Sequence, residues 1–252
     1  MDDACGARLA SLHLGGHEVL QRGDQHDDPL RWGAYPMAPW AGRLRNGHLI
    51  VEGTPWQVRG AGMAGDHPLH GTIADRPWQV TEHSERSVTC TIDLGERWPL
   101  PGRVTHRIVL EAHAVTCELT LIAGPRAFPA QVGWHPWFTA PWTRQVGFRG
   151  RYRRDHEVLP TGDLDPEVVD ALGPEPRDDC FVGPRWPPRL VHPDGGVLEI
   201  TSDCSHWVVY DEPGHAVCIE PQSGPPDGAH LEPVVLPPGG SLRRFMRIAA
   251  VP

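Results

Sequence analysis

Two residues able to transfer protons stand in the same setting, directly before a proline. His135 lies in GWHPWF and Glu220 lies in CIEPQSGPPDG, so Pro136 and Pro221 follow them. A proline disfavours helical backbone at the preceding residue and favours an extended conformation. Each side chain therefore leaves the chain in a defined direction, which general acid and base catalysis requires. An imidazole and a carboxylate presented in this way could protonate and deprotonate a bound substrate.

Both residues also have a purely structural interpretation. A histidine flanked by Trp134 and Trp137 is more often a hydrogen-bonded core residue than a catalytic one. Alternation along 216–221 places Glu220 on the face of Cys218, where a buried carboxylate would need a partner or a raised pKa. The same residue could equally be the solvent-facing end of a strand.

Aromatic and polar residues elsewhere suggest a sugar as the ligand. Ten tryptophans are present, and Trp40, Trp134 and Trp137 stand near the polar candidates. Aromatic rings suit the apolar faces of a sugar, whereas carboxylates and arginines bind its hydroxyls. In a regular strand Trp137 shares the face of His135 and Trp134 does not. We therefore expect Trp137 to contact substrate and Trp134 to belong to the core.

Other constellations are weaker. His67 and His70 are three residues apart in a proline-containing segment rather than on a helix face, so we expect no metal site. The serine-hydrolase and nucleotide-binding glycine motifs are missing from the sequence. The arginines of FRGRYRRDH (148–156) could clamp a phosphate, but a solvated loop is the favoured interpretation.

The elements that must position these residues read as strands. Apolar residues alternate with polar ones, and clusters of glycine and proline, 28 of each, separate the runs. The predicted strands cover 87–94, 114–122, 196–202, 206–212, 216–221 and 242–251. The only clear helix signal is DPEVVDALG (165–173), where Asp165 would cap and Gly173 would end a short helix. We predict one all-β domain over 1–252, built from large antiparallel sheets.

The net charge, the N-terminal sequence and the cysteines argue against several kinds of partner and cellular location. The net charge of −9 argues against nucleic acid and anionic membranes as partners. All 23 basic residues are arginine, which a coding bias explains. The acidic N-terminus is unlike a signal peptide, and no run of 18 apolar residues occurs. Six scattered cysteines fit reduced, mostly buried thiols, so we expect a cytoplasmic protein.

Five segments, taken in order, resemble the aldose 1-epimerase (galactose mutarotase) family. They are YPMAPWAGRLRNGHLIVEG (35–53), HPLHGTIADRPWQV (67–80), VGWHPWF (132–138), RDDCF (177–181) and CIEPQSGPPDG (218–228). No one of them is decisive, but five in the same order are specific, and they span most of the chain.

The resemblance implies a β-supersandwich fold and interconversion of the α and β anomers of a free sugar without a cofactor. It implies that His135 is the general acid and Glu220 the general base. It places His70 near the ring oxygen and Arg43 and Asp178 on the sugar hydroxyls, although adjacent Asp179 could take the place of Asp178. We expect the acid and the base to face each other across a cleft that admits a pyranose ring.

Two departures from the family pattern bear on the substrate. The family often has asparagine before the arginine, where this chain has Gly42, and the chain is shorter than the better-known galactose mutarotases. Three alternatives remain: a hexose-6-phosphate mutarotase, a non-catalytic sugar-binding module on the same fold, and a metal-dependent β-barrel isomerase. We expect a sugar as the ligand and a monomer or homodimer as the assembly.

Overall fold

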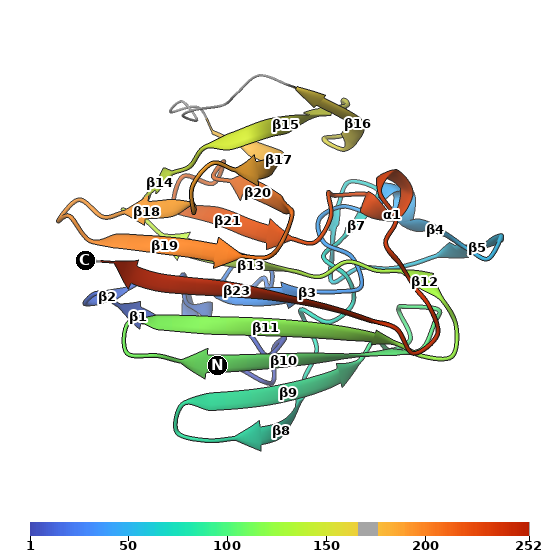
Figure 1. Cartoon of the computed structure of the whole chain (residues 1–252), viewed down its shortest axis with the longest axis horizontal. Helices are drawn as coiled ribbons and strands as arrows, with labels where there is room; N and C mark the ends of the chain where they lie inside the picture. Colours follow the sequence, from blue (N-terminus) through green and yellow to red (C-terminus); the bar gives the residue numbers. More distant parts are fainter. Residues whose placement is uncertain (166–175, 252) are drawn as a thin grey trace.

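The computed structural model describes residues 1–165 and 176–251. Its regular structure consists almost entirely of antiparallel strands in two large sheets (Figure 1). The eight-stranded sheet has the order β14 (Thr143–Gln145), β18 (Arg189–Val191), β19 (Val197–Ser202), β23 (Ser241–Val251), β11 (Ala114–Ala123), β10 (Gly102–Leu110), β9 (Ser87–Asp93) and β8 (Gln79–His83). The seven-stranded sheet has the order β16 (Pro160–Asp165), β15 (Phe148–Arg154), β17 (Asp178–Pro184), β20 (His206–Tyr210), β21 (Ala216–Gln222), β13 (Gly133–Thr139) and β3 (Ala34–Met37).

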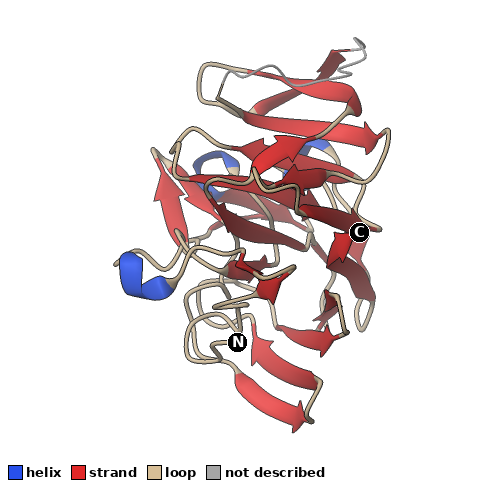
Figure 2. Cartoon of the chain, turned by 90° about the vertical axis from the view of Figure 1, so that its left-hand side faces the viewer, coloured by secondary structure: helices blue, strands red, loops and turns tan. Residues whose placement is uncertain are grey.

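Short elements connect and flank these sheets. Four two-stranded ribbons pair β1 (His13–Leu14) with β2 (His17–Glu18), β4 (His48–Val51) with β5 (Thr54–Gln57), β6 (Gly62–Ala64) with β7 (His67–Leu69), and β12 (Phe128–Pro129) with β22 (Val235–Leu236). The helical segments η1 (Gly23–Gln25), η2 (Arg45–Gly47) and α1 (Gly228–Leu231) are single turns in connections outside the sheets (Figure 2). Among the described residues, none of the helices is long and apolar enough to cross a membrane. The predicted all-β fold with very little helix is confirmed.

Alternation along the strands divides the molecule into a core and a second face. On β11, Val115, Cys117, Leu119 and Leu121 are all buried, as their period of two predicted. They share one hydrophobic cluster with Trp134 and with Val217 and Ile219 of β21. The neighbouring residues of the seven-stranded sheet, including Trp137 and Cys218, belong to a separate cluster. The second face of this sheet therefore points away from the main core, and it carries the candidate site.

The six strands predicted from the sequence are present as β9, β11, β19, β20, β21 and β23. The interpretation of the arginine-rich segment as a loop is wrong, because residues 148–154 form strand β15. Phe148, Gly150 and Tyr152 are buried in alternation there, and the arginines occupy the positions between them. The helix predicted over 165–173 lies outside the described residues, apart from Asp165, which ends β16. All six cysteines are free, and five are buried.

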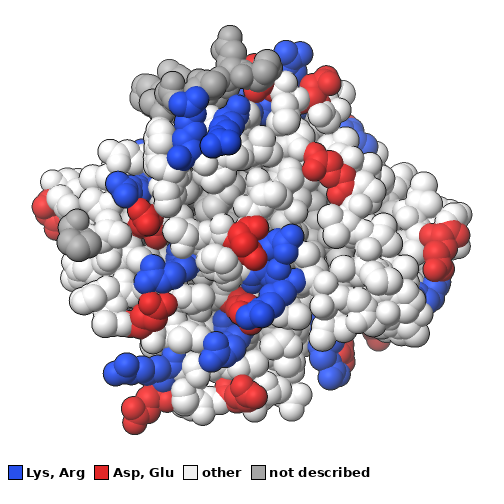
Figure 3. Space-filling view, in the orientation of Figure 1, with Lys and Arg blue, Asp and Glu red and all other residues white. Residues whose placement is uncertain are grey.

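Ion pairs between neighbouring strands and turns balance charge on the outer surface. On the face shown in Figure 3, arginines and acidic side chains are interspersed rather than gathered by sign. Arg247 of β23 pairs with Glu111 at 3.0 Å, and Arg189 of β18 pairs with Glu199 of β19 at 2.8 Å. Pairs this exposed contribute about 0–1 kcal/mol each, so burial of the apolar core dominates stability.

A buried histidine links the two sheets. On β10, His106 Nδ1 donates to the Ala7 carbonyl at 3.0 Å, and Nε2 accepts from Trp134 Nε1 at 3.2 Å. Both partners fit only the neutral ring, since a protonated Nε2 would face another N–H donor. Burial lowers the pKa of His106 to about 4.

We expect His106 to make the fold sensitive to acid. A histidine pKa depressed by folding gives stability that is present above the unfolded pKa of about 6.5 and is lost as pH falls towards about 4. The difference between the unfolded and folded pKa values corresponds to about 3 kcal/mol in the free energy of unfolding. We would measure the free energy of unfolding in urea at pH 7 and at pH 4.5. The decrease between the two pH values should be smaller for His106→Gln than for the unaltered chain. Equal losses in the two proteins would contradict this role.

Candidate active site

The two proton-transfer candidates are opposite neighbours on two adjacent inner strands of the seven-stranded sheet. Strands β13 and β21 pair Gly133 with Gln222 and Trp137 with Cys218. Two residues inward from each of these pairs, the same register sets His135 opposite Glu220. Side chains directly opposite on antiparallel strands have Cβ atoms about 5 Å apart, and His135 Nε2 lies 3.2 Å from Glu220 Oε1. Both side chains are buried.

The prolines that follow these residues interrupt the hydrogen-bond ladder. No pairing is recorded for 134–136 with 219–221, although the register is the same on both sides of this gap. Pro136 and Pro221 lie in the gap and have no N–H to donate. The strands keep their register while their main-chain pairing is relaxed at the level of the two candidate residues.

We expected His135 and Glu220 to face each other across a cleft, but they do not. They lie side by side at its floor, because cross-strand neighbours project from the same face of a sheet. The cleft has a volume of about 380 Å³, which falls in the usual range for small-molecule sites. Its lining includes all six residues predicted for the site: Arg43, His70, His135, Trp137, Asp178 and Glu220.

Burial controls the protonation of the pair. It lowers the pKa of His135 well below its ordinary value, and nearby His70 adds to that effect. It raises the pKa of Glu220 well above its ordinary value, as does Asp178, whereas the hydrogen bond from Gln222 and the charge of Arg43 oppose the rise. The attraction between the two partners at 3.2 Å favours the ion pair instead, but removal of both from water is the larger effect. Burial therefore favours the neutral form of the pair, in which the carboxyl group holds the proton.

Aromatic rings hold His135 in place. Its ring stacks on Tyr35 at a centroid distance of 4.9 Å and on Trp137 at 5.1 Å. His70 meets it edge-on at 5.0 Å. Trp137 therefore lies on the face of His135, as alternation predicted, while Trp134 is in the core. Trp40 also packs in the core rather than in the cleft.

His70 occupies a strained position. Its φ of 58° is in the left-handed region, which is uncommon for a residue with a side chain and is frequent at functional sites. Its N–H donates to the carbonyl of Gly42 at 3.0 Å. Burial, aided by the charge of Arg43, lowers the pKa of His70 to about 3. The ring is therefore neutral and can both donate and accept a hydrogen bond.

Arg43 and Asp178 form an ion pair at the cleft wall, with 2.9 Å between Nη2 and Oδ2. Adjacent Asp179 is buried away from the cleft and pairs with Arg154 at 3.0 Å and Arg177 at 3.7 Å. Of the two aspartates, Asp178 is therefore the one able to meet a ligand. The arginines of β15 are absent from the cleft lining, although Arg154 donates to the Asp178 carbonyl at 2.6 Å.

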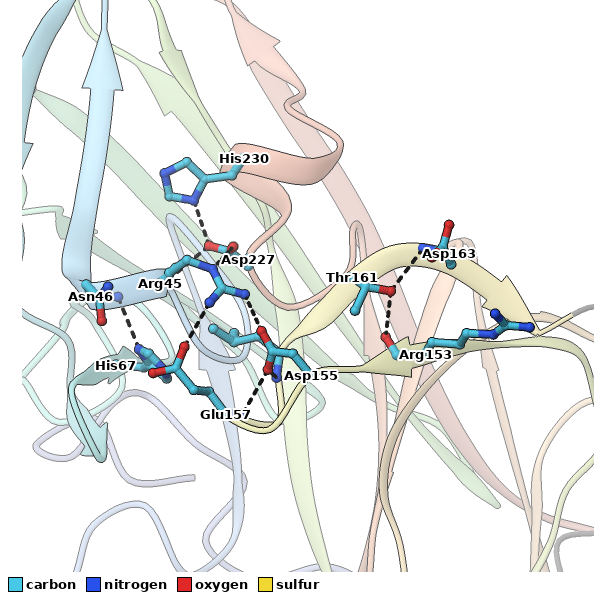
Figure 4. A network of polar contacts seen from close by, with 11 residues as sticks. Arg45, Asn46, His67, Arg153, Asp155, Glu157, Thr161, Asp163, Asp227 and His230 are labelled. Atoms are coloured by element: carbon cyan, nitrogen blue, oxygen red, sulfur yellow. Dashed lines mark hydrogen bonds and ion pairs between the residues drawn. The ribbon is translucent and has the colours of Figure 1, made fainter.

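A polar network fixes the segment that carries Arg43 (Figure 4). Arg45 lies between Asp155 at 2.7 Å, Glu157 at 2.9 Å and Asp227 at 3.5 Å. The Asp227 carboxylate also accepts from the Arg45 N–H at 2.9 Å, and the Asp227 N–H donates to the Arg43 carbonyl at 2.7 Å. The network therefore ties the loop before α1 and the turn between β15 and β16 to the Arg43 backbone.

The structure explains why a glycine, Gly42, precedes Arg43. Gly42 has a φ of 67°, and a Cβ built on it would lie 2.9 Å from the Cβ and Cγ atoms of Pro226. Asparagine tolerates this backbone region, but the proline ring occupies the space that its side chain would need. Pro226 therefore forms this part of the cleft wall in place of a side chain at position 42.

Three of the cleft residues that were not predicted from the sequence contact His135, Trp137 or Glu220 directly. Tyr35 stacks on His135, Tyr210 meets Trp137 edge-on at 5.9 Å, and Gln222 donates to Glu220 Oε2 at 3.0 Å. Gln222 could have been found, since it lies two residues after Glu220 on the same face. The buried atoms His70 Nδ1 and Gln222 Oε1 have no hydrogen-bond partner among the described residues. Both residues line the cleft, so the site suits a ligand rich in polar groups.

These features define a sandwich of antiparallel sheets with a buried histidine–glutamate pair at the floor of a polar and aromatic cleft. The sequence profile of aldose 1-epimerases matches residues 4–249, and the chain belongs to the aldose 1-epimerase family. A relative from Escherichia coli K12, named "Uncharacterized protein YihR", is 26% identical over 96% of this chain and 87% of its own length.

Solved structures share the fold. A galactose mutarotase-like protein from Clostridium acetobutylicum has a TM-score of 0.84 at 14% identity, covering 99% of this chain and 90% of its own. A galactose 1-epimerase from Lactobacillus acidophilus has a TM-score of 0.78 at 16% identity, covering 100% of this chain and 92% of its own. At these identities the likeness concerns the fold alone.

Proposed function

We propose that this protein interconverts the α and β anomers of a free aldohexose by acid–base catalysed ring opening and closure. The observation that carries the proposal is the contact of 3.2 Å between His135 Nε2 and Glu220 Oε1 at the floor of the cleft. Ring opening requires a proton on the ring oxygen and the loss of one from the anomeric hydroxyl. These two oxygens share one carbon, so an acid and a base that are adjacent can serve both.

The resting pair reaches its reactive form by a proton shift within the contact. Moving the proton from Glu220 to His135 gives a carboxylate and an imidazolium without changing the net charge. Glu220 then takes the proton of the anomeric hydroxyl, His135 protonates the ring oxygen, and the sugar opens to its aldehyde. The pair is neutral again at this point, which is the form that burial favours. Rotation about C1–C2 and the reverse transfers close the ring with the other configuration.

The other cleft residues bind and orient the sugar. Arg43 and Asp178 contact hydroxyl groups, His70 lies near the ring oxygen, and Trp137 provides an apolar surface. Among the described residues, the lining contains four acidic side chains, Asp28, Asp178, Glu212 and Glu220. Its two arginines are already paired, Arg43 with Asp178 at 2.9 Å and Arg31 with Asp28 at 3.4 Å. This charge distribution supports an unphosphorylated sugar as the substrate.

The test is polarimetry on freshly dissolved α-D-glucose and α-D-galactose, with their 6-phosphates in parallel. We expect faster mutarotation of a free sugar than in buffer, a smaller effect on the phosphates, and no loss of activity with EDTA. Binding without acceleration would instead support a sugar-binding module. Preference for a phosphate, or activity abolished by EDTA, would support a hexose-6-phosphate mutarotase or a metal-dependent isomerase respectively.

A further inference from the structure

Three side chains with metal-binding atoms meet outside the cleft. His17 begins β2, whereas His192 and Asp194 belong to the turn between β18 and β19, and both segments lie on the left-hand side of Figure 1. His17 Nε2 lies 3.0 Å from Asp194 Oδ2, and His192 Nδ1 lies 2.8 Å from Asp194 Oδ1. The three donor atoms are all within 4.8 Å of one another. None of these residues lines the cleft.

The surroundings hold the imidazoles in place. Trp142 packs against His17 at a centroid distance of 5.5 Å and against His192 at 5.0 Å, and the two imidazoles lie 4.1 Å apart. The Gly196 N–H donates to Asp194 Oδ1 at 3.0 Å, which orients the carboxylate. The histidine side chains are 25% and 17% exposed and that of Asp194 is 53% exposed. The donor atoms are thus fixed and still accessible from solvent.

We propose that His17, His192 and Asp194 form a binding site for a divalent transition-metal ion such as Zn²⁺. Two imidazoles and one carboxylate suit zinc and its neighbours rather than Mg²⁺ or Ca²⁺, which favour oxygen ligands. Donor atoms about 2.1 Å from a tetrahedral ion lie about 3.4 Å apart. The two contacts, 3.0 Å to Asp194 Oδ2 and 2.8 Å to Asp194 Oδ1, are shorter, so a small separation of the side chains admits the ion. Each imidazole binds the ion through a ring nitrogen that carries no proton, so a proton on His17 Nε2 or His192 Nδ1 moves to the other ring nitrogen, and water completes the coordination.

The consequence of binding is structural. The ion connects the β1–β2 ribbon to the β18–β19 turn, two segments that are far apart in the sequence. An ion bound only by the folded chain stabilises it according to the ion concentration. At a free concentration of about 100 times the dissociation constant, the unfolding temperature should rise by about 5–10 °C.

The experiment is calorimetric titration of the whole chain, freed of metal, with Zn²⁺, together with unfolding temperatures with and without the ion. We expect one Zn²⁺ per chain at this site, loss of that binding in His17→Gln and His192→Gln, and no change in His13→Gln. His13 is the matched control, because it is on the same ribbon but outside the cluster. Circular dichroism of the variants shows whether they fold.

A second group of possible metal ligands lies in the cleft, and the experiment must distinguish it from the proposed site. His135, Cys218 and Glu220 also bring metal-binding atoms within 4.8 Å of one another, but all three are buried in the cleft. If Zn²⁺ binding is lost in Cys218→Ser and retained in His17→Gln and His192→Gln, the ion binds at the cleft and the proposal is wrong. Absence of binding by the folded, unaltered chain also overturns it. Neither result depends on the proposed catalytic activity.

Discussion

Glu220→Gln should reduce the rate of mutarotation about 10²–10⁴-fold while leaving the protein folded. The amide has nearly the shape of the carboxyl group but cannot accept the proton of the anomeric hydroxyl. Gln222 Nε2 can still donate to the side-chain oxygen at position 220, as it does now over 3.0 Å. The measurement is the initial rate of optical rotation change at saturating sugar, with circular dichroism as the check on folding.

The same substitution should not destabilise the fold. Burial raises the pKa of Glu220, so its carboxyl group stabilises the fold fully only below the unfolded pKa, and that stability is lost as pH rises through the folded pKa. An amide has no such dependence. We therefore expect the variant to be at least as stable as the unaltered chain. The difference in their free energies of unfolding should increase with rising pH. Glu82→Gln on exposed strand β8 is the matched control and should keep full activity. Full activity of Glu220→Gln would show that Glu220 is not the base.

His135→Asn should also reduce the rate about 10²–10⁴-fold, and the double variant should lose little more than one single variant does. The two residues share one proton across 3.2 Å, so removal of either one disables the other. We expect the double variant to be within about tenfold of the less active single variant. The measurement is the same rate assay on all four proteins of the double-mutant cycle.

Losses that multiply in the double variant would mean that the two side chains act independently. His13→Asn on the β1–β2 ribbon provides the control for this substitution, because that histidine is exposed and outside the cleft. Retention of full activity by a folded His135→Asn would exclude His135 as the acid.

Many of the strands could be predicted from the local alternation of apolar and polar residues. Strand β11 alternates so regularly that its buried residues could be named in advance. Strand β15 was missed because its buried positions are Phe148, Gly150 and Tyr152, where the small residue weakens the apolar pattern and the arginines between them dominate the composition. The turn of helix α1 follows two prolines and lacks an amphipathic pattern long enough to detect.

The candidate site was predictable in its members but not in its geometry. Motif order identified the residues, whereas the side-by-side arrangement of His135 and Glu220 depends on the register of two strands separated by a long stretch of chain. Tyr35 enters the site for the same reason, because β3 pairs with β13 and sets Tyr35 opposite His135. Long-range pairing of this kind leaves no trace in local spacing.

The contact between Gly42 and Pro226 makes the two positions mutually dependent. Each change is conditional on the other: a side chain at 42 first requires a smaller or displaced residue at 226, and loss of the proline ring opens space that glycine cannot fill. Adaptation of this cleft to a different sugar would therefore require replacements at both positions. The order of the two replacements determines whether the protein with only one of them still has an intact cleft wall.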